Sequence, residues 1–134
     1  MPIPPRAPYA LDLPPFPLPA LVAHAGRAPI GNGREVALAT LVVARLALGL
    51  LDGSAVPTVL REQRAASARV WLASLALPST TRVPIARAIE ASVTGPTAVA
   101  GALRSVLAAT SGWLDPAAID ELTALIQRLL NGGD

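Results

Sequence analysis

The apolar residues of most of the chain repeat at intervals of three or four positions. From residue 20 onward this spacing places them on one side of an α-helix, and the repeats are interrupted at Gly, Pro and Asn. The pattern predicts helices at about residues 20–25, 32–51, 54–76, 82–93 and 97–109, and a last one that begins at Pro116 and ends at Asn131-Gly132-Gly133. We therefore predict an all-α fold, a compact bundle of five to six short helices formed by residues 20–131.

The segment 32–51 is expected at the centre of this bundle. Its apolar residues go nearly all the way round the predicted helix, which is typical of a helix that is buried on every side. Glu35 follows Asn32 at the spacing of a capping box, so we expect Asn32 to be the N-cap of this helix.

The segment 54–76 has two different faces, and we expect Ser54 to be its N-cap. One arc of the helix carries Val56, Val59, Gln63, Ala66, Val70, Trp71, Ala73 and Leu77, and the other carries Arg61, Glu62, Arg64 and Arg69. This division predicts that the first arc is buried and that the charged arc faces solvent. Three arginines on one solvated face also form a candidate docking patch for an acidic partner.

Two later helices have start signals of their own. Thr80 or Thr81 is expected to cap the helix at 82–93, and Asp115, followed by Pro116, to cap the last helix. The apolar stripe of the last helix either closes the core or forms a two-fold seam with another copy of the chain.

Residues 1–19 differ from the rest of the chain. Eight of the 14 prolines lie here, at positions 2, 4, 5, 8, 14, 15, 17 and 19, so this segment is predicted to be an extended, polyproline-like arm. Its apolar residues, including Tyr9, Leu13, Phe16 and Leu18, are unusual for a flexible linker. We expect the arm to pack on its own bundle, on a second copy or on a partner, and its PxxP spacings fit the motifs that aromatic grooves bind.

Composition and charge narrow the classes of protein. The chain has no Cys, which excludes a disulfide scaffold, a Cys-liganded zinc site and a thiol enzyme. All 11 basic residues are Arg and the net charge is only +2, so the pI of 10.4 reflects missing Lys and Cys rather than a nucleic-acid footprint. The longest apolar run, 36–51, contains Thr40 and Arg45 and is shorter than the ~20 residues of a membrane span. We expect no membrane span and a cytoplasmic protein.

The sequence offers no clear catalytic set. His24 is the one histidine, and neither a second histidine nor a cysteine is present to complete a metal site. Gly31-Asn32-Gly33 precedes a helix, but it is too short for a phosphate-binding fingerprint. We therefore predict no catalytic residues, no cofactor and no metal.

The function predicted from these features is that of a non-enzymatic interaction or assembly subunit, which docks on a larger protein or self-associates. The candidate contact residues are Tyr9, Leu13, Phe16, Leu18, Trp113, Arg61, Arg64 and Arg69. One alternative is a DNA-associated regulator with a degenerate helix-turn-helix at 82–93 and 97–109, although the second helix lacks side chains that read bases. Another is a bundle that binds a small molecule in a pocket near His24 or Arg45.

Overall fold

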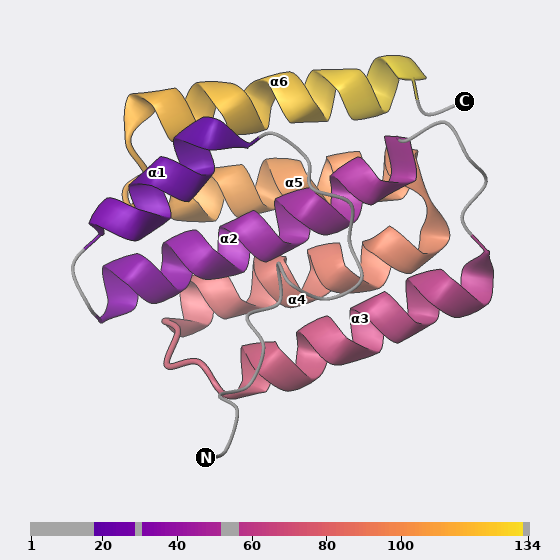
Figure 1. The fold of residues 1–134 in the computed structure, drawn as a ribbon, viewed down its shortest axis with the longest axis horizontal. Coiled ribbons are helices and arrows are strands. Elements are labelled where there is room, and N and C mark those ends of the chain that lie inside the picture. Colours follow the sequence, from indigo (N-terminus) through magenta and orange to yellow (C-terminus); the bar gives the residue numbers. More distant parts are fainter. Residues whose placement is uncertain (1–17, 29–30, 52–56, 133–134) are drawn as a thin grey trace.

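The computed structural model describes residues 18–28, 31–51 and 57–132. Within them it contains six α-helices, one short 3₁₀ helix and no strand, so the predicted all-α bundle is confirmed (Figure 1). The elements are α1 (Pro19–Arg27), α2 (Asn32–Leu48), η2 (Gly49–Leu51), α3 (Thr58–Ala73), α4 (Ser79–Thr94), α5 (Pro96–Thr110) and α6 (Pro116–Gly132). None of the described helices is long and apolar enough to cross a bilayer.

The helix α2 lies at the centre of the bundle, as its sequence predicts. It contacts each of the other five α-helices (Figure 1). Most of its residues are buried, and Arg34, Leu38 and Arg45 on one side are half-buried. Ala37, Ala44 and Ala47 are fully buried there, and because alanine is small the neighbouring helices can approach closely. The core around α2 also contains further alanines and the side chains of Leu, Val and Ile residues.

The start of α2 differs from the predicted capping box. Asn32 is the first residue of the helix, and the N-cap is Gly31, whose φ of 125° suits glycine. The Glu35 carboxylate does not turn back to its own helix. It accepts a hydrogen bond from the Ala76 N–H (3.1 Å), after the end of α3. The capping-box prediction is therefore wrong, because Glu35 has a tertiary partner.

The predicted caps of α3 and α4 are also not those observed. The helix α3 begins after Pro57, and Ser54 lies outside the described residues. The helix α4 begins at Ser79 with Pro78 as N-cap, and the Thr81 hydroxyl donates to the Pro78 carbonyl (2.9 Å) instead of capping. A helix that starts three residues earlier than expected leaves Thr80 and Thr81 inside its first turn.

The boundary between arm and bundle lies slightly earlier than predicted. Pro19 is the first residue of α1, and Leu18, its N-cap, is buried in the core. These two residues belong to the bundle because the Leu18 side chain packs with the core cluster. The rest of the predicted arm, residues 1–17, lies outside the described residues.

The helix α3 is oriented differently from the prediction: Glu62 and Arg69 are exposed as expected, but Arg61 and Arg64 turn inward. Ala65, Ala68 and Leu72 are buried, whereas Val59 and Val70 are 66% and 75% exposed. The prediction that the valine arc is buried is therefore wrong.

Arginine explains this orientation of α3. Arg61 and Arg64 lie partly buried on the inner side of the helix. The Arg61 guanidinium donates to the Thr94 carbonyl at the end of α4 (3.2 Å). The Arg64 guanidinium lies against Gly49, where a Cβ atom would come within 3.2 Å of it. The aliphatic stems of arginine pack as apolar groups, and the charges sit at helix C-termini, where the helix dipole favours a cation.

The first turn of α1 is capped by a residue of the last helix. Glu121 of α6 accepts hydrogen bonds from the N–H groups of Ala20 (3.0 Å) and Leu21 (2.8 Å). The N-cap position of α1 is Leu18, whose side chain has no acceptor. Glu121 therefore takes the place of a local cap and fixes α1 to α6.

We predict that Glu121→Ala lowers the free energy of unfolding by about 1–2 kcal/mol, because two N–H groups lose their acceptor. Glu121→Gln retains one acceptor and should lose less. Urea unfolding measures both, with Gln127→Ala, an exposed change on the same helix, as the control. Equal stability of Glu121→Ala and the control would contradict this role.

Candidate functional site

The solvent side of α3 carries an apolar strip, which we call the outer face of α3. It consists of Val59, Gln63, Ala66 and Val70, all exposed, at successive spacings of four, three and four residues. This is the spacing with which one helix packs along another. The helix forms one edge of the bundle and is covered on its inner side by α2 and α4 (Figure 1).

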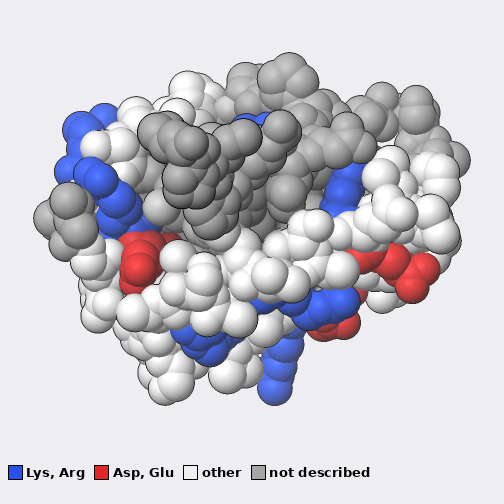
Figure 2. All heavy atoms as spheres, turned by 60° about the horizontal axis from the view of Figure 1, so that its bottom comes forward, with Lys and Arg blue, Asp and Glu red and all other residues white. Residues whose placement is uncertain are grey.

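Charged residues border the outer face along one side only. Glu62 and Arg69 lie toward α4, where Arg69 forms an ion pair with Glu90. The opposite border carries the small, uncharged Ser67 and Ser74. Figure 2 turns the lower edge of the bundle forward, and on this side the charged side chains form small separate groups with uncharged surface between them.

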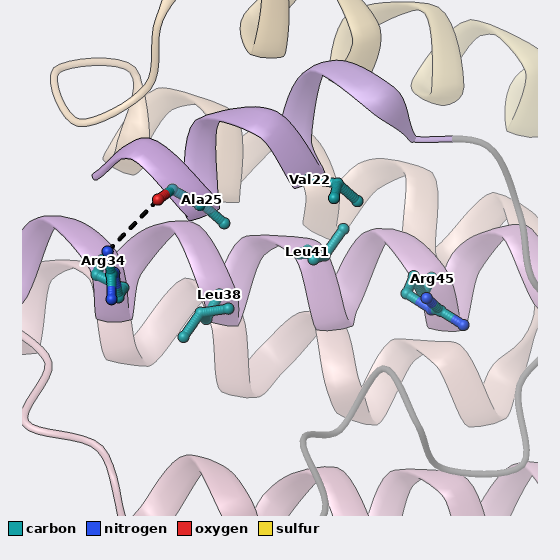
Figure 3. A pocket seen from close by; sticks show the side chains of 7 residues that line it. Val22, Ala25, Arg34, Leu38, Leu41 and Arg45 are labelled. Carbon is teal, nitrogen blue, oxygen red and sulfur yellow. Dashed lines mark hydrogen bonds between the residues drawn. The ribbon is translucent and has the colours of Figure 1, made fainter. Parts of the chain in front are cut away.

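A second candidate site is an open groove between α1 and α2. It has a volume of about 490 Å³ and is lined by Val22, Ala25, Gly26, Arg34, Leu38, Leu41 and Arg45 (Figure 3). Val22, Leu38 and Leu41 make its middle apolar, and an arginine lies at each end. Apolar concavities with a few polar groups are typical of sites for small ligands.

The two arginines of this groove are held differently. Arg34 donates to the Ala28 carbonyl (3.0 Å) and to the Gly26 carbonyl (3.5 Å), the latter drawn as a dashed line in Figure 3, and so caps the end of α1. Arg45 extends from α2 toward the other end of the groove (Figure 3). Each end of the otherwise apolar floor therefore carries a positive charge.

The His24 side chain belongs to a charged cluster between α1 and α6. Its Nδ1 lies 3.3 Å from Asp115 Oδ2, and its Nε2 lies 2.9 Å from the Trp113 carbonyl oxygen. Both neighbours are acceptors, and only a doubly protonated imidazole can donate to both. The described residues include no group of three or more His, Asp or Glu side chains placed to hold a metal ion. The cluster connects α1 to α6. Among the described residues, His24 forms no hydrogen bond with a Ser, Thr or Tyr hydroxyl.

Asp115 is the centre of this cluster and the N-cap of α6, as the sequence predicts. Its Oδ1 accepts the Ala118 N–H (2.9 Å) and its Oδ2 accepts from Arg27 (2.7 Å). The hydrogen bond from Ala118, followed by those from Arg27 and the charge of His24, lowers the pKa of Asp115 below its usual 3.8.

The candidate contact residues from the sequence are not brought together. Tyr9, Leu13 and Phe16 lie outside the described residues. Leu18 is a core residue only 4% exposed, so it is not available as a surface contact. Trp113 is partly exposed in the turn between α5 and α6.

The proposed arginine patch is divided between two environments. Arg61 and Arg64 turn inward against α2 and α4, and Arg69 is exposed but paired with Glu90. The three therefore do not form one solvated face for an acidic partner. The spacing of Val59, Gln63, Ala66 and Val70 was visible in the sequence, but the same spacing equally describes a buried stripe.

The α4–α5 pair gives the DNA alternative no support. The two helices are separated by Gly95 alone, whereas a helix-turn-helix uses a turn of three to four residues. Val99 and Leu103 are buried, and the Arg82 guanidinium donates hydrogen bonds to the carbonyls of Leu72 and Leu75. The polar residues that α5 exposes are Thr97, Arg104 and Ser105, of which Arg104 alone carries a charge that could contact a phosphate.

Comparison with known proteins adds no family assignment. No protein-family model matches the chain, and no curated protein or solved structure matches it. The candidate sites therefore rest on their own geometry.

We predict a pH dependence for the Asp115 cap. A carboxyl group whose pKa is lowered by folding adds stability above its unfolded pKa, and this stability is lost as the pH falls through the folded pKa. Asp115→Asn keeps a cap oxygen but removes the charge. The protein should therefore exceed the variant in free energy of unfolding above about pH 5, and the difference should shrink in more acidic solution. Chemical unfolding across the acidic range measures this, with Asp120→Asn as the control. A difference that grows on acidification would contradict it.

Proposed function

We propose that the protein is a non-enzymatic interaction and assembly subunit, which binds a protein partner through the outer face of α3. The observation that carries this proposal is the position of Val59 and Val70, which are the two most exposed large apolar residues described and lie on one strip of one helix. Scattered exposed valines are ordinary, but aligned valines form a contact surface.

The physical chemistry of this strip supports docking of a helix. Burial of an exposed valine contributes about 1.5–3 kcal/mol, and the two valines with Ala66 offer an apolar ridge that only Gln63 interrupts. Glu62 and Arg69 form a polar border beside it, as is usual around the apolar centre of an interface. The expected partner therefore presents an amphipathic helix.

Two further parts of the proposal come from the sequence. The first is a second contact through the arm at residues 1–17, which lies outside the described residues. We also place the protein in the cytoplasm, since a chain without Cys gains nothing from an oxidising compartment.

We predict that Val70→Glu abolishes association through α3 and leaves the fold intact. Because the side chain is 75% exposed, the free energy of unfolding should change by no more than about 0.5 kcal/mol. Chemical unfolding and light scattering measure the two effects. Val22→Glu is the matched control, because Val22 is 51% exposed on α1 and lies in the groove instead. If both variants associate like the unmodified protein, α3 is not the docking surface.

The α1–α2 groove favours a second candidate function, the binding of a small amphipathic molecule. Its volume of about 490 Å³ lies within the range of small-molecule sites, and the pocket lies beside Arg45. The chemistry of the lining suits an apolar body with one anionic group, which would lie over Leu38 and Leu41 and reach an arginine.

For this groove we predict that anilinonaphthalene sulfonate, an apolar anionic dye, binds the folded protein. Val22→Trp should weaken its binding about tenfold, because the larger side chain fills the groove. Val70→Trp, the same change at an exposed valine of α3, should leave the affinity unchanged. Fluorescence titration measures both variants. Equal dye affinity in both would remove this candidate.

A further inference from the structure

We infer that the partner of the outer face of α3 is a second copy of this chain, whose α3 packs antiparallel to that of the first. The inference rests on the proposed function and names the partner. Its basis is the arrangement of apolar and charged residues along α3, which is complementary to itself when one copy is reversed.

The apolar strip matches itself in the antiparallel direction. If the centre of the contact lies between Gln63 and Ala66, Val59 faces Val70 of the second copy and Gln63 faces Ala66 of the second copy. By symmetry each of these contacts occurs twice. The four positions therefore pair with one another without leaving an unmatched residue, and Ala66 gives the two backbones room to approach near the middle.

The charges select the antiparallel direction. Glu62 directly precedes Gln63 and Arg69 directly precedes Val70, so both lie along the same border of the strip. In the antiparallel arrangement Glu62 lies across from Arg69 of the second copy, and the reverse pair forms by symmetry. In a parallel two-fold arrangement the charged border of each copy would instead lie opposite the uncharged Ser67 and Ser74 border of the other, so neither opposite-charge pair could form.

The ion pair inside each chain does not prevent this contact. Arg69 is bonded to Glu90 through one guanidinium nitrogen, Nη1, and is about half exposed. A guanidinium carries five N–H donors, so it can serve a second carboxylate. The other border of the strip, with Ser67 and Ser74, carries no charge that would oppose a close approach.

The size of the contact indicates a dimer that dissociates on dilution. The helix has 16 residues and is about 24 Å long. One helix pair of this length buries less than the roughly 800 Å² per partner of a standard interface. Self-association should therefore depend on concentration, and Val59 and Val70 are exposed in the single chain.

The first test is a charge exchange measured by sedimentation across a dilution series into the millimolar range. Glu62→Arg and Arg69→Glu should each weaken the dimer about tenfold, because like charges then face each other. The double variant restores opposite charges and should restore the dimer. Glu90→Gln, which removes only the pair inside the chain, should leave dimerisation unchanged. A double variant no better than the singles would overturn the inference.

The second test measures the register. The chain has no Cys, so an introduced cysteine is the one thiol present. An oxidised mixture of Val59→Cys and Val70→Cys should give mainly the mixed disulfide dimer. Two Val59→Cys chains would hold their thiols about 16 Å apart along the helix axis and should not cross-link. Preferential cross-linking of Val59→Cys with itself would show a parallel contact and refute the antiparallel one.

The outcomes also separate this inference from the proposed function. If the protein is monomeric at every concentration, the inferred self-pairing is wrong. The proposed docking of a helix from a different protein on α3 is then tested separately by Val70→Glu. A dimer that persists in both Val70→Glu and the charge-reversed variants overturns both, because another surface then holds the two copies together.

Discussion

The ends of the helices impose the main constraint on this fold. From α1 to α5 the N-cap residues are Leu18, Gly31, Pro57, Pro78 and Gly95, none of which has a side-chain acceptor. Backbone groups at helix ends must still find partners when water is excluded. Several are bonded by charged side chains from other elements. Glu121 bonds the start of α1, Arg82 bonds the end of α3 and Arg61 bonds the end of α4. Only 15% of the chain is charged, and three of these residues, Glu121, Arg82 and Arg61, form these bonds.

This use of charge decides which surface α3 offers. Arg61 turns inward to Thr94 and Arg64 turns toward Gly49, on the side of the helix that buries Ala65, Ala68 and Leu72, and the valines on the other side face solvent. A lysine-free chain suits this arrangement, since arginine reaches backbone carbonyls with several donors while its stem packs among Leu46 and Leu50. The apolar strip at the surface is thus a consequence of how the neighbouring helices end. The same residues that stabilise the bundle create the surface through which we propose that it associates.

The candidate sites differ in what they can do chemically. The outer face of α3 is convex and continuous, which suits another helix, whereas the α1–α2 groove is concave and has an arginine at either end, which suits a small amphipathic anion. The His24 cluster joins α1 to the start of α6, and its donors and acceptors are directed at one another. It therefore contributes to the position of α1, which forms one wall of the groove.

The sequence by itself determined the helical class, the central place of α2 and the start of α6. These features depend on local patterns: an apolar residue on every side of one helix, and Asp115 followed by Pro116 at the start of another. Only the tertiary structure decided the orientation of α3 and the partners of Glu35 and Glu121. The spacing of Val59 and Val70 is the same for a buried and an exposed strip, and a carboxylate can cap its own helix or a distant one. Which of these occurs depends on long-range neighbours, here Thr94, Ala76 and Ala20, that no local pattern contains.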